Sequence, residues 1–304
     1  MTPEEQKFYA EKLEWMRTAV PSDGTLELSA GRKFDLFLAR AQGKPQAATK
    51  YLVLVLPGGG YEFCSYREEN VVGRFFARAG FDALVIDYPV RLYEEAVPGK
   101  GVGLEVMHVV GSVIKELRTR PELGFSEHKI VLCGFSAGGH LAATMATLYD
   151  SEELSDLGSG ALLRPDGVIL SYPVISADPK LAHAVTFGCF TGSADPQDWG
   201  RYSCERNVTA DTPPMFVWHT ATDEGVAVGN SLTMAQALWQ HGCPCELHIL
   251  ARGPHGASLA RAEVEPGFSV VDDYLAQWFD QAITFIRTFG TRAVDFLGSS
   301  DRVR

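Results

Sequence analysis

The sequence lacks the marks of several large protein classes. None of its apolar runs reaches the ~18 residues that cross a bilayer, and the polar start at residues 1–7 leads into no apolar signal segment. Lysine and arginine form no cluster, and the formal net charge is −11. We therefore expect no membrane span and no nucleic-acid partner.

Cysteine is also scarce. The six cysteines are scattered, and several lie in apolar stretches where a reduced, buried thiol is the usual state. With no signal segment in front of them, we expect a cytoplasmic protein. His241, Cys243, Cys245 and His248 are residue types that bind zinc, but Cys-x-Cys is not the usual structural pair and residues 245–249 are typical of a strand. We expect neither a metal nor an organic cofactor.

The sequence does contain a regular alternation of strands and helices. Short segments such as 51–56 and 83–87 are almost continuously apolar, and a helix-like segment follows each of them. That pattern is typical of a parallel sheet with helices on both faces. We predict an α/β fold with a mostly parallel, doubly wound sheet of about eight strands. Its first two strands, 25–29 and 33–40, are expected to form an antiparallel edge.

One large domain accounts for most of the chain. We place it at residues 25–290, after a helical extension at 1–24 and before a weakly patterned, loose tail at 291–304. The segment 174–212 interrupts the alternation and is rich in glycine, aspartate, serine and proline. Because it follows the carboxyl end of a strand, we interpret it as a partial lid over the site. A solvated connection without a role is the alternative.

The most informative stretch is a glycine-rich turn. Gly134, Ser136 and Gly138 form a G-x-S-x-G between an apolar strand at 129–133 and a helix-like segment at 141–148. This is the context of a nucleophile elbow, where small flanking residues permit a sharp turn that exposes the serine hydroxyl. An incidental serine in a turn is the alternative, so the case depends on partners for the serine.

A serine nucleophile needs a base, and a histidine base needs a carboxylate to orient it. His255 stands between glycines shortly after a strand that ends at Leu250, which places it at the carboxyl edge of the sheet, where Ser136 also points. Asp223 follows the strand at 215–219 and fits the carboxylate best. We predict that Ser136, His255 and Asp223 form a catalytic triad.

Other candidates fit these roles less well. Glu224 is the runner-up to its neighbour for the carboxylate, whereas Asp87 ends a strand that precedes the serine, which is the wrong order. His140 lies on the helix after the serine, where a packing role is expected. His219 ends a strand near the site, and we interpret it as structural although it could line the site.

The tetrahedral intermediate of acyl transfer needs N–H donors for its oxyanion. One is expected from Ala137, directly after the nucleophile, and others from Gly59 and Gly60 in the loop that follows the strand at 51–56. A phosphate-binding glycine loop is the alternative. It is disfavoured because neither a G-x-G-x-x-G pattern nor a Lys-Ser/Thr pair follows.

Together these residues resemble α/β-hydrolase-fold acetyl esterases and lipases, near the bacterial branch with carbohydrate acetylesterases and feruloyl esterases. The resemblance covers about residues 25–290 and is carried by four ordered segments, 56–61, 133–142, 212–223 and 253–256. The order Ser…Asp…His is that of the α/β-hydrolase fold.

The resemblance implies roles for single residues. Ser136, Asp223 and His255 match the triad of the family, and the loop of Gly59 and Gly60 with Ala137 matches its oxyanion hole. The family often has a proline four residues after the aspartate, where this chain has Ala227, so the geometry of that loop is open to question.

The resemblance also implies a function. It points to a serine carboxylic-ester hydrolase that acts through an acyl-enzyme on short-chain, acetyl-type esters, including those of acylated carbohydrates. We assign Tyr61, Phe187 and Phe190 to the substrate pocket. The expected partner is a small-molecule or carbohydrate ester, and a homo-oligomer is compatible with the sequence.

Two alternatives belong to other classes. A peptidase of the prolyl-oligopeptidase type or a small amidase shares the triad order, but no repeated propeller blades precede residue 51. A binding protein that kept the fold and lost the chemistry is disfavoured because all three triad residues are present.

Overall fold

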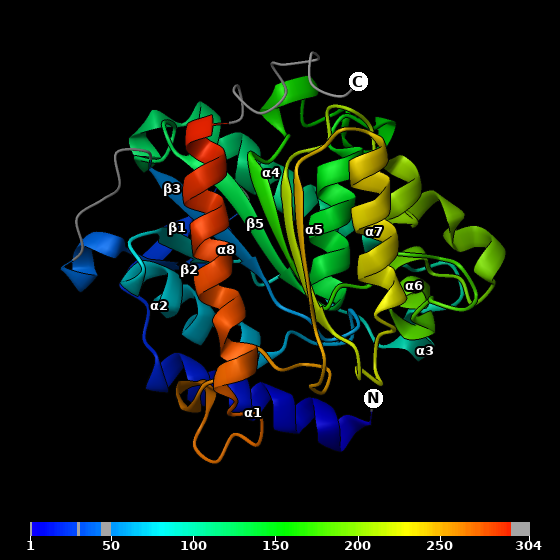
Figure 1. Cartoon of the computed structure of the whole chain (residues 1–304), viewed down its shortest axis with the longest axis horizontal. Helices are drawn as coiled ribbons and strands as arrows, with labels where there is room; N and C mark the ends of the chain where they lie inside the picture. The colour runs from blue at the N-terminus through cyan, green and yellow to red at the C-terminus, as the bar shows by residue number, and fades with distance from the viewer. Residues whose placement is uncertain (1, 29–30, 44–49, 293–304) are drawn as a thin grey trace, which may run out of the picture.

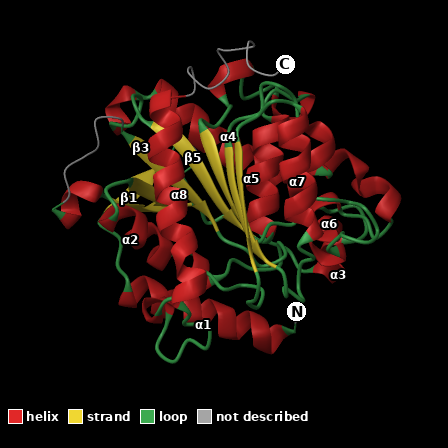
Figure 2. Cartoon of the chain, viewed as in Figure 1, coloured by secondary structure: helices red, strands yellow, loops and turns green. Residues whose placement is uncertain are grey.

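A sheet of eight strands runs through the centre of the protein (Figures 1 and 2). The structure is a computed structural model that describes residues 2–28, 31–43 and 50–292. The strands are short and mostly buried, and they are β1 Gly24–Glu27, β2 Lys33–Phe37, β3 Tyr51–Leu56, β4 Asp82–Val85, β5 Lys129–Phe135, β6 Gly167–Ser171, β7 Met215–Thr220 and β8 Cys245–Leu250.

The strand order is β1-β2-β4-β3-β5-β6-β7-β8. Pairing is antiparallel from β1 to β2 and from β2 to β4, and parallel from β4 through β8. The predicted fold class, a mostly parallel sheet with an antiparallel N-terminal edge, is therefore confirmed. Because β5 to β8 are parallel, the loops that follow them emerge at one edge of the sheet.

Eight α-helices surround the sheet in the described part of the chain: α1 Pro3–Ala19, α2 Asn70–Arg78, α3 Tyr93–Ala96, α4 Gly103–Thr119, α5 Ala137–Leu148, α6 Ala184–Thr191, α7 Gly229–Gln240 and α8 Asp273–Arg292. Side chains of β3 alternate between two cores. Leu52 and Leu54 pack in the core with α4, α5 and α7, whereas Val53 and Val55 pack in the core with α2 and α8. Both faces are covered, which explains why the strand sequences are apolar throughout.

Helix α1 lies across the carboxyl edge of the sheet, below the strands in Figure 1 and at the end where α5, α7 and α8 begin. It is held there by packing and charge. The ring of Tyr9 stacks on Phe63 with centroids 3.9 Å apart, and Lys12 Nζ lies 3.3 Å from Glu265 Oε2. The predicted helical extension thus lies on the same side of the molecule as Ser136, which directly follows β5.

Two helix boundaries differ from the predictions. The helix expected at 68–79 is broken at Glu69, whose ψ of −115° is outside the helical range, into a 3₁₀ turn at Tyr66–Glu68 and α2. The helix after Ser136 begins at Ala137 instead of Leu141, because the turn at Ser136 passes directly into it. Glycines next to the turn hid this start in the sequence, since they lower helix propensity.

The segment 174–212 is more ordered than its composition indicated, since it contains α6 and 3₁₀ helices at Pro196–Tyr202 and Cys204–Asn207. The last helix continues to Arg292, and the remainder of the predicted tail lies outside the described residues. In the described ranges, no helix combines the length and apolar character required to cross a membrane.

Candidate active site

Ser136 occupies a strained turn between β5 and α5. Its φ of 51° and ψ of −114° lie in a region that non-glycine residues rarely adopt. Hydrogen bonds fix the turn, because the Ser136 N–H donates to Ser171 O at 3.0 Å and Val174 N donates to Ser136 O at 3.1 Å. The backbone therefore presents the hydroxyl at the end of β5, as in a nucleophile elbow.

Glycine is required on both sides of the elbow because backbone atoms approach closely. A Cβ on Gly134 would lie 2.2 Å from Gly138 O, and one on Gly138 would lie 2.1 Å from Leu56 O. Neither carbonyl can move aside without disturbing a strand or the helix. The G-x-S-x-G pattern thus has a steric cause in this fold.

The structure brings Ser136, His255 and Asp223 into one hydrogen-bonded chain. His255 Nε2 lies 2.8 Å from Ser136 Oγ, and His255 Nδ1 lies 2.7 Å from Asp223 Oδ2. The Asp223 loop passes so close to the imidazole that a Cβ on Gly225 would lie 2.9 Å from His255 Cγ. Glu224, the runner-up for the carboxylate, is exposed, and Asp87 forms an ion pair with Arg17 instead.

Four donors hold the Asp223 carboxylate. Oδ1 accepts from the N–H groups of Gly225 and Val226, each at 2.8 Å, and Oδ2 accepts from His255 and from His219 Nε2 at 3.1 Å. Burial by itself would raise the pKa of Asp223, but the hydrogen bonds from His219 and His255 and the charge of His255 outweigh it and hold the pKa well below its usual range. The carboxylate is therefore ionised at neutral pH.

The loop after β3 lies against Ser136. A Cβ on Gly58 would lie 3.0 Å from Ser136 Cβ, and three residues in a row have positive φ, Gly59 at 126°, Gly60 at 66° and Tyr61 at 65°. Gly59 O accepts from Glu62 N and Phe63 N. Backbone of this kind directs successive N–H groups to one side, which suits an anion.

A buried carboxylate supports that loop. Glu68 Oε2 accepts from Gly58 N at 2.7 Å, and Glu68 Oε1 accepts from the Tyr172 hydroxyl at 2.6 Å. The same hydroxyl accepts from Ser258 N at 2.9 Å, and the Tyr172 ring meets the His255 ring edge-on at 5.1 Å. Burial raises the pKa of Glu68, and the two hydrogen bonds oppose that rise. One network thus connects Gly58, next to the oxyanion candidates, with Tyr172 and with Ser258 in the loop that follows His255.

The three residues assigned to the substrate pocket are placed in the interior. Tyr61 and Phe187 are 0% exposed and Phe190 is 2% exposed, and all three rings pack around His140. The Tyr61 hydroxyl donates to His140 Nδ1 at 3.0 Å, and His140 Nε2 donates to Tyr202 O at 3.0 Å. Burial lowers the pKa of His140 to about 4, so this histidine is a neutral packing residue, as predicted. The pocket role of the three rings stays a prediction.

The start of α6 belongs to the surroundings of the site. Val185 Cγ1 would lie 3.4 Å from a Cβ on Gly60, so the insert contacts the candidate oxyanion loop. His183 caps α6, and its Nδ1 accepts from Thr186 N at 3.3 Å. Burial lowers the pKa of His183, and the charge of His255 lowers it further, whereas Asp223 and Glu62 oppose the shift.

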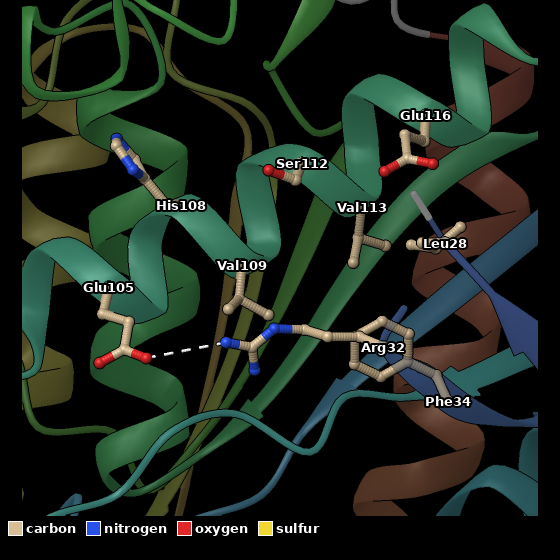
Figure 3. A pocket seen from close by; sticks show the side chains of 9 residues that line it. All are labelled: Leu28, Arg32, Phe34, Glu105, His108, Val109, Ser112, Val113 and Glu116. Carbon is tan, nitrogen blue, oxygen red and sulfur yellow. Dashed lines mark ion pairs between the residues drawn. The ribbon is translucent and has the colours of Figure 1, made fainter. Parts of the chain in front are cut away.

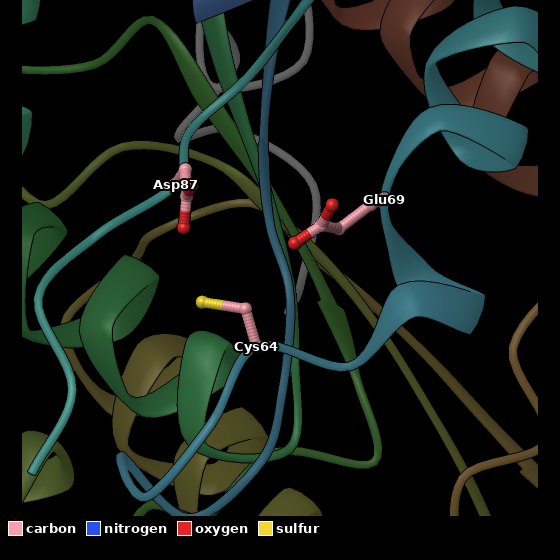
Figure 4. Close-up of side chains that lie close together, drawn as sticks. All are labelled: Cys64, Glu69 and Asp87. Atoms are coloured by element: carbon pink, nitrogen blue, oxygen red, sulfur yellow. The ribbon is translucent and has the colours of Figure 1, made fainter. Parts of the chain in front are cut away.

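One cluster in the described residues has the side-chain types of a metal site. The ligand atoms of Cys64, Glu69 and Asp87 lie within 4.8 Å of one another (Figure 4). Arg17 already provides a cation there, since its Nη2 lies 3.0 Å from Asp87 Oδ2 and 3.8 Å from Glu69 Oε2. We therefore describe this group as an ion-pair cluster that anchors α1, and not as a metal centre.

A cavity of about 220 Å³ lies between β2 and α4, away from the triad (Figure 3). An ion pair between Arg32 and Glu105, 3.7 Å apart, crosses its edge. Its lining contains none of the candidate site residues and consists of Leu28, Arg32, Phe34, Glu105, His108, Val109, Ser112, Val113 and Glu116.

Sequence reasoning missed three residues at this site. His219 was expected to be structural, but it contacts Asp223 directly; its position four residues before Asp223, at the end of β7, was an available signal. Glu68 and Tyr172 were not identified at all. No local pattern reveals that pair, because 104 positions separate its members. Ala227 stands where the family often has a proline. Its carbonyl oxygen accepts from Asn230 N at 3.0 Å, so it lies in an ordered loop.

A family model described as the alpha/beta hydrolase fold matches residues 53–259. Among curated proteins, this chain is 34% identical over 224 residues to endo-1,4-beta-xylanase B of Butyrivibrio fibrisolvens, a match that covers 71% of this chain and 34% of that protein. It is 27% identical over 245 residues to an acetylxylan esterase of Xylanibacter ruminicola, covering 76% of this chain and 47% of that protein. The chain thus spans about a third to a half of the length of the curated relatives it matches.

Solved structures give similar matches over nearly their whole length. The acetyl ester-xyloside bifunctional hydrolase from Caldicellulosiruptor lactoaceticus has a TM-score of 0.70 and 27% identity, covering 89% of this chain and 98% of that one. A carboxylesterase from Lactobacillus plantarum has a TM-score of 0.68 and 28% identity, covering 88% of this chain and 96% of that one.

Proposed function

Because the chain belongs to the alpha/beta hydrolase fold family, whose relatives here include esterases, we propose that it is a serine carboxylic-ester hydrolase with Ser136, His255 and Asp223 as its catalytic triad. One observation carries the proposal. Ser136 Oγ, in a strained turn, lies 2.8 Å from His255 Nε2, while Asp223 holds His255 Nδ1 at 2.7 Å. This is the geometry by which a neutral imidazole removes the proton of a serine hydroxyl.

The reaction follows from that geometry. His255 Nε2 accepts the hydroxyl proton as Ser136 Oγ attacks the ester carbonyl, and Asp223 stabilises the imidazolium that forms. The imidazolium then protonates the departing alcohol, which leaves an acyl group on Ser136. In the second half, His255 takes a proton from water, the hydroxide attacks the acyl carbon, and the acid is released as the serine recovers its proton.

The oxyanion of each tetrahedral intermediate requires donors in place before it forms. We assign this role to the N–H groups of Gly59, Gly60 and Ala137. Ala137 is the first residue of α5, so its N–H has no partner within the helix. Among the described residues, no main-chain acceptor takes the N–H of Gly59 or Gly60.

We further propose short acyl groups, acetyl first, as the substrate class, with acylated carbohydrates as the source of the ester. The support is the naming of two relatives, an acetylxylan esterase and an acetyl ester-xyloside bifunctional hydrolase. An amidase or peptidase of the same fold would use the same triad, and a silent binding protein would lack turnover.

A panel of substrates separates these alternatives. Hydrolysis of p-nitrophenyl acetate, butyrate and octanoate is measured beside that of an acetyl anilide and beside acetate release from acetylated xylo-oligosaccharides, for wild type and Ser136→Ala. We expect turnover of esters in the order acetate, butyrate, octanoate, and a loss of about 10⁵-fold or more in the variant. Preference for the anilide, or an absence of turnover on every substrate, would contradict the proposal.

A further inference from the structure

A cavity of about 260 Å³ lies between α1 and the loop that follows Gly60. It is separate from the cavity of Figure 3, with which it shares no lining residue. Its lining combines aromatic, polar and acidic side chains and consists of Gln6, Tyr9, Ala10, Leu13, Glu62, Phe63, Cys64, Asp87 and Val90.

One face of α1 forms a wall of this cavity. Gln6, Tyr9, Ala10 and Leu13 follow the spacing i, i+3, i+4, i+7, which places them on the same side of the helix. The helix is anchored within this stretch by the ion pair of Lys12 with Glu265, and one turn beyond it by the ion pair of Arg17 with Asp87. The wall is therefore part of the folded protein and not of a loose end.

The opposite wall continues directly from the candidate oxyanion loop. Gly59 O accepts from Glu62 N at 2.9 Å and from Phe63 N at 3.3 Å, so the residues at 59–63 form one tight turn. A Cβ on Gly59 would lie 2.0 Å from Phe63 O, which shows how close the cavity wall is to this glycine. Gly58, at the start of the same loop, lies against Ser136, because a Cβ on it would lie 3.0 Å from Ser136 Cβ.

The chemistry of the lining selects a class of ligand. None of the nine lining residues is basic, and two are carboxylates: Asp87, which is paired with Arg17, and Glu62, which also accepts from Tyr93 N. The lining therefore favours a neutral ligand over an anionic group such as a phosphate or a uronate. Glu62, Asp87 and Gln6 offer acceptors for hydroxyl groups, while the stacked rings of Tyr9 and Phe63 offer an apolar surface. The volume is just below the ~300 Å³ at which ligand pockets usually begin, which suits a small ring and not a long acyl chain.

We propose that this cavity binds a neutral sugar ring of an acetylated oligosaccharide, next to the ring whose ester lies at Ser136. The inference rests on the proposed ester hydrolase function and assigns α1 a part in substrate recognition. Carboxylates and the amide accept hydrogen bonds from sugar hydroxyls, and the aromatic wall contacts the C–H face of the ring.

Filling the cavity tests the proposal without removing any contact that the fold needs. Ala10 lines the cavity and is exposed, so Ala10→Trp places an indole in the space. The adjacent Glu11 lies off this face with a side chain 68% exposed, so Glu11→Trp is the matched control. For the control, we expect wild-type kinetics on every substrate.

Two substrates distinguish recognition from catalysis. In Ala10→Trp, we expect the KM for acetylated xylotriose to rise about tenfold, while kcat/KM for p-nitrophenyl acetate, which has no sugar, stays at the wild-type value. An unchanged KM for the sugar ester, or an equal loss on both substrates, would overturn the assignment.

A binding measurement keeps this inference separate from the proposed function. Ligand-observed NMR with unacetylated xylotriose needs no turnover, and we expect saturable binding to wild type and to Glu11→Trp that is lost in Ala10→Trp. That result supports the sugar site even if wild type cleaves no ester, in which case only the hydrolase proposal fails. Absent binding to wild type, or binding that Ala10→Trp leaves unchanged, would refute the sugar site.

Discussion

His219 Nε2 lies 3.1 Å from Asp223 Oδ2, the same oxygen that accepts from His255. The imidazole of His219 is 0% exposed, and its Nδ1 accepts from the Ser231 hydroxyl at 2.8 Å. Nε2 also lies 3.0 Å from Val226 O, which can only accept, so the His219 proton is on Nε2 and is shared between Val226 O and Asp223. We therefore expect His219 to act as a positioning residue, because it fixes the carboxylate that orients His255 in the proposed triad.

Removing the His219 donor should affect kcat more clearly than the stability of the fold. We expect His219→Phe to lower kcat by about tenfold with little change in KM for p-nitrophenyl acetate, because Asp223 loses one of the bonds that fix it. His219→Gln, whose amide N–H can replace Nε2–H, should restore most of kcat. A kinetic comparison with Ser231→Ala, which leaves Nε2–H in place, provides the control. Equal kcat in wild type and His219→Phe would contradict the assignment.

Tyr172→Phe tests the buried network. The substitution leaves Ser258 N without its acceptor and Glu68 Oε1 without its donor, so we expect a loss of about 1–3 kcal/mol in the free energy of unfolding, measured in urea. Tyr274→Phe is the matched control, because that hydroxyl also accepts a backbone N–H, from Ala251, but the residue is 38% exposed. Similar losses in both variants would show that burial of the network does not increase the stability lost with the hydroxyl group.

Gly138→Ala should be far more damaging than its single methyl group implies. The new Cβ would lie 2.1 Å from Leu56 O and 2.3 Å from Pro57 O, both of which are backbone atoms. We expect a loss of about 3 kcal/mol or more, or failure to accumulate folded protein. Gly24→Ala, where no atom lies within 4 Å of the new Cβ, should keep its wild-type urea midpoint. Wild-type stability of Gly138→Ala would show that the elbow is looser than described.

The buried carboxyl group of Glu69 should make the free energy of unfolding depend on pH. Burial, with the charge of Asp87 adding to it, raises the pKa of Glu69 to about 8 from its ordinary 4.5. The folded state therefore binds a proton that the unfolded state releases, so this contribution is complete below pH 4.5 and is lost as the pH rises through about 8. We expect Glu69→Gln to reduce the fall in stability between pH 5 and pH 8.5 by on the order of 2 kcal/mol. Parallel stability curves for the two proteins would contradict this.

Much of the fold could be predicted because its signals are local. Strand segments that are apolar on both faces, such as β3, require helices on both sides of a sheet. The meeting of Ser136, Asp223 and His255 followed from one geometric rule, since the carboxyl ends of parallel strands share an edge. The glycine-flanked turn at Ser136 could be predicted from its local sequence without knowledge of distant contacts.

What could not be predicted depends on packing between distant segments. The burial of Tyr61, Phe187 and Phe190 depends on how α6 packs on His140. Glu69, where the predicted helix is broken, lies 3.8 Å from Arg17 of the distant helix α1. The hydrogen bond between Glu68 and Tyr172 likewise cannot be predicted from the sequence around either residue. Whether 174–212 acts as a lid stays a prediction, because a single arrangement of the chain contains no second state.

The most direct test of the account is the site of covalent modification by a fluorophosphonate, located by peptide mass spectrometry. The account predicts one adduct, on Ser136, which forms rapidly in wild type and at least about 100-fold more slowly in His255→Ala, because the serine then lacks its base. An adduct on another residue, or an equal rate in His255→Ala, would show that Ser136 is not the activated nucleophile and would contradict the central claim.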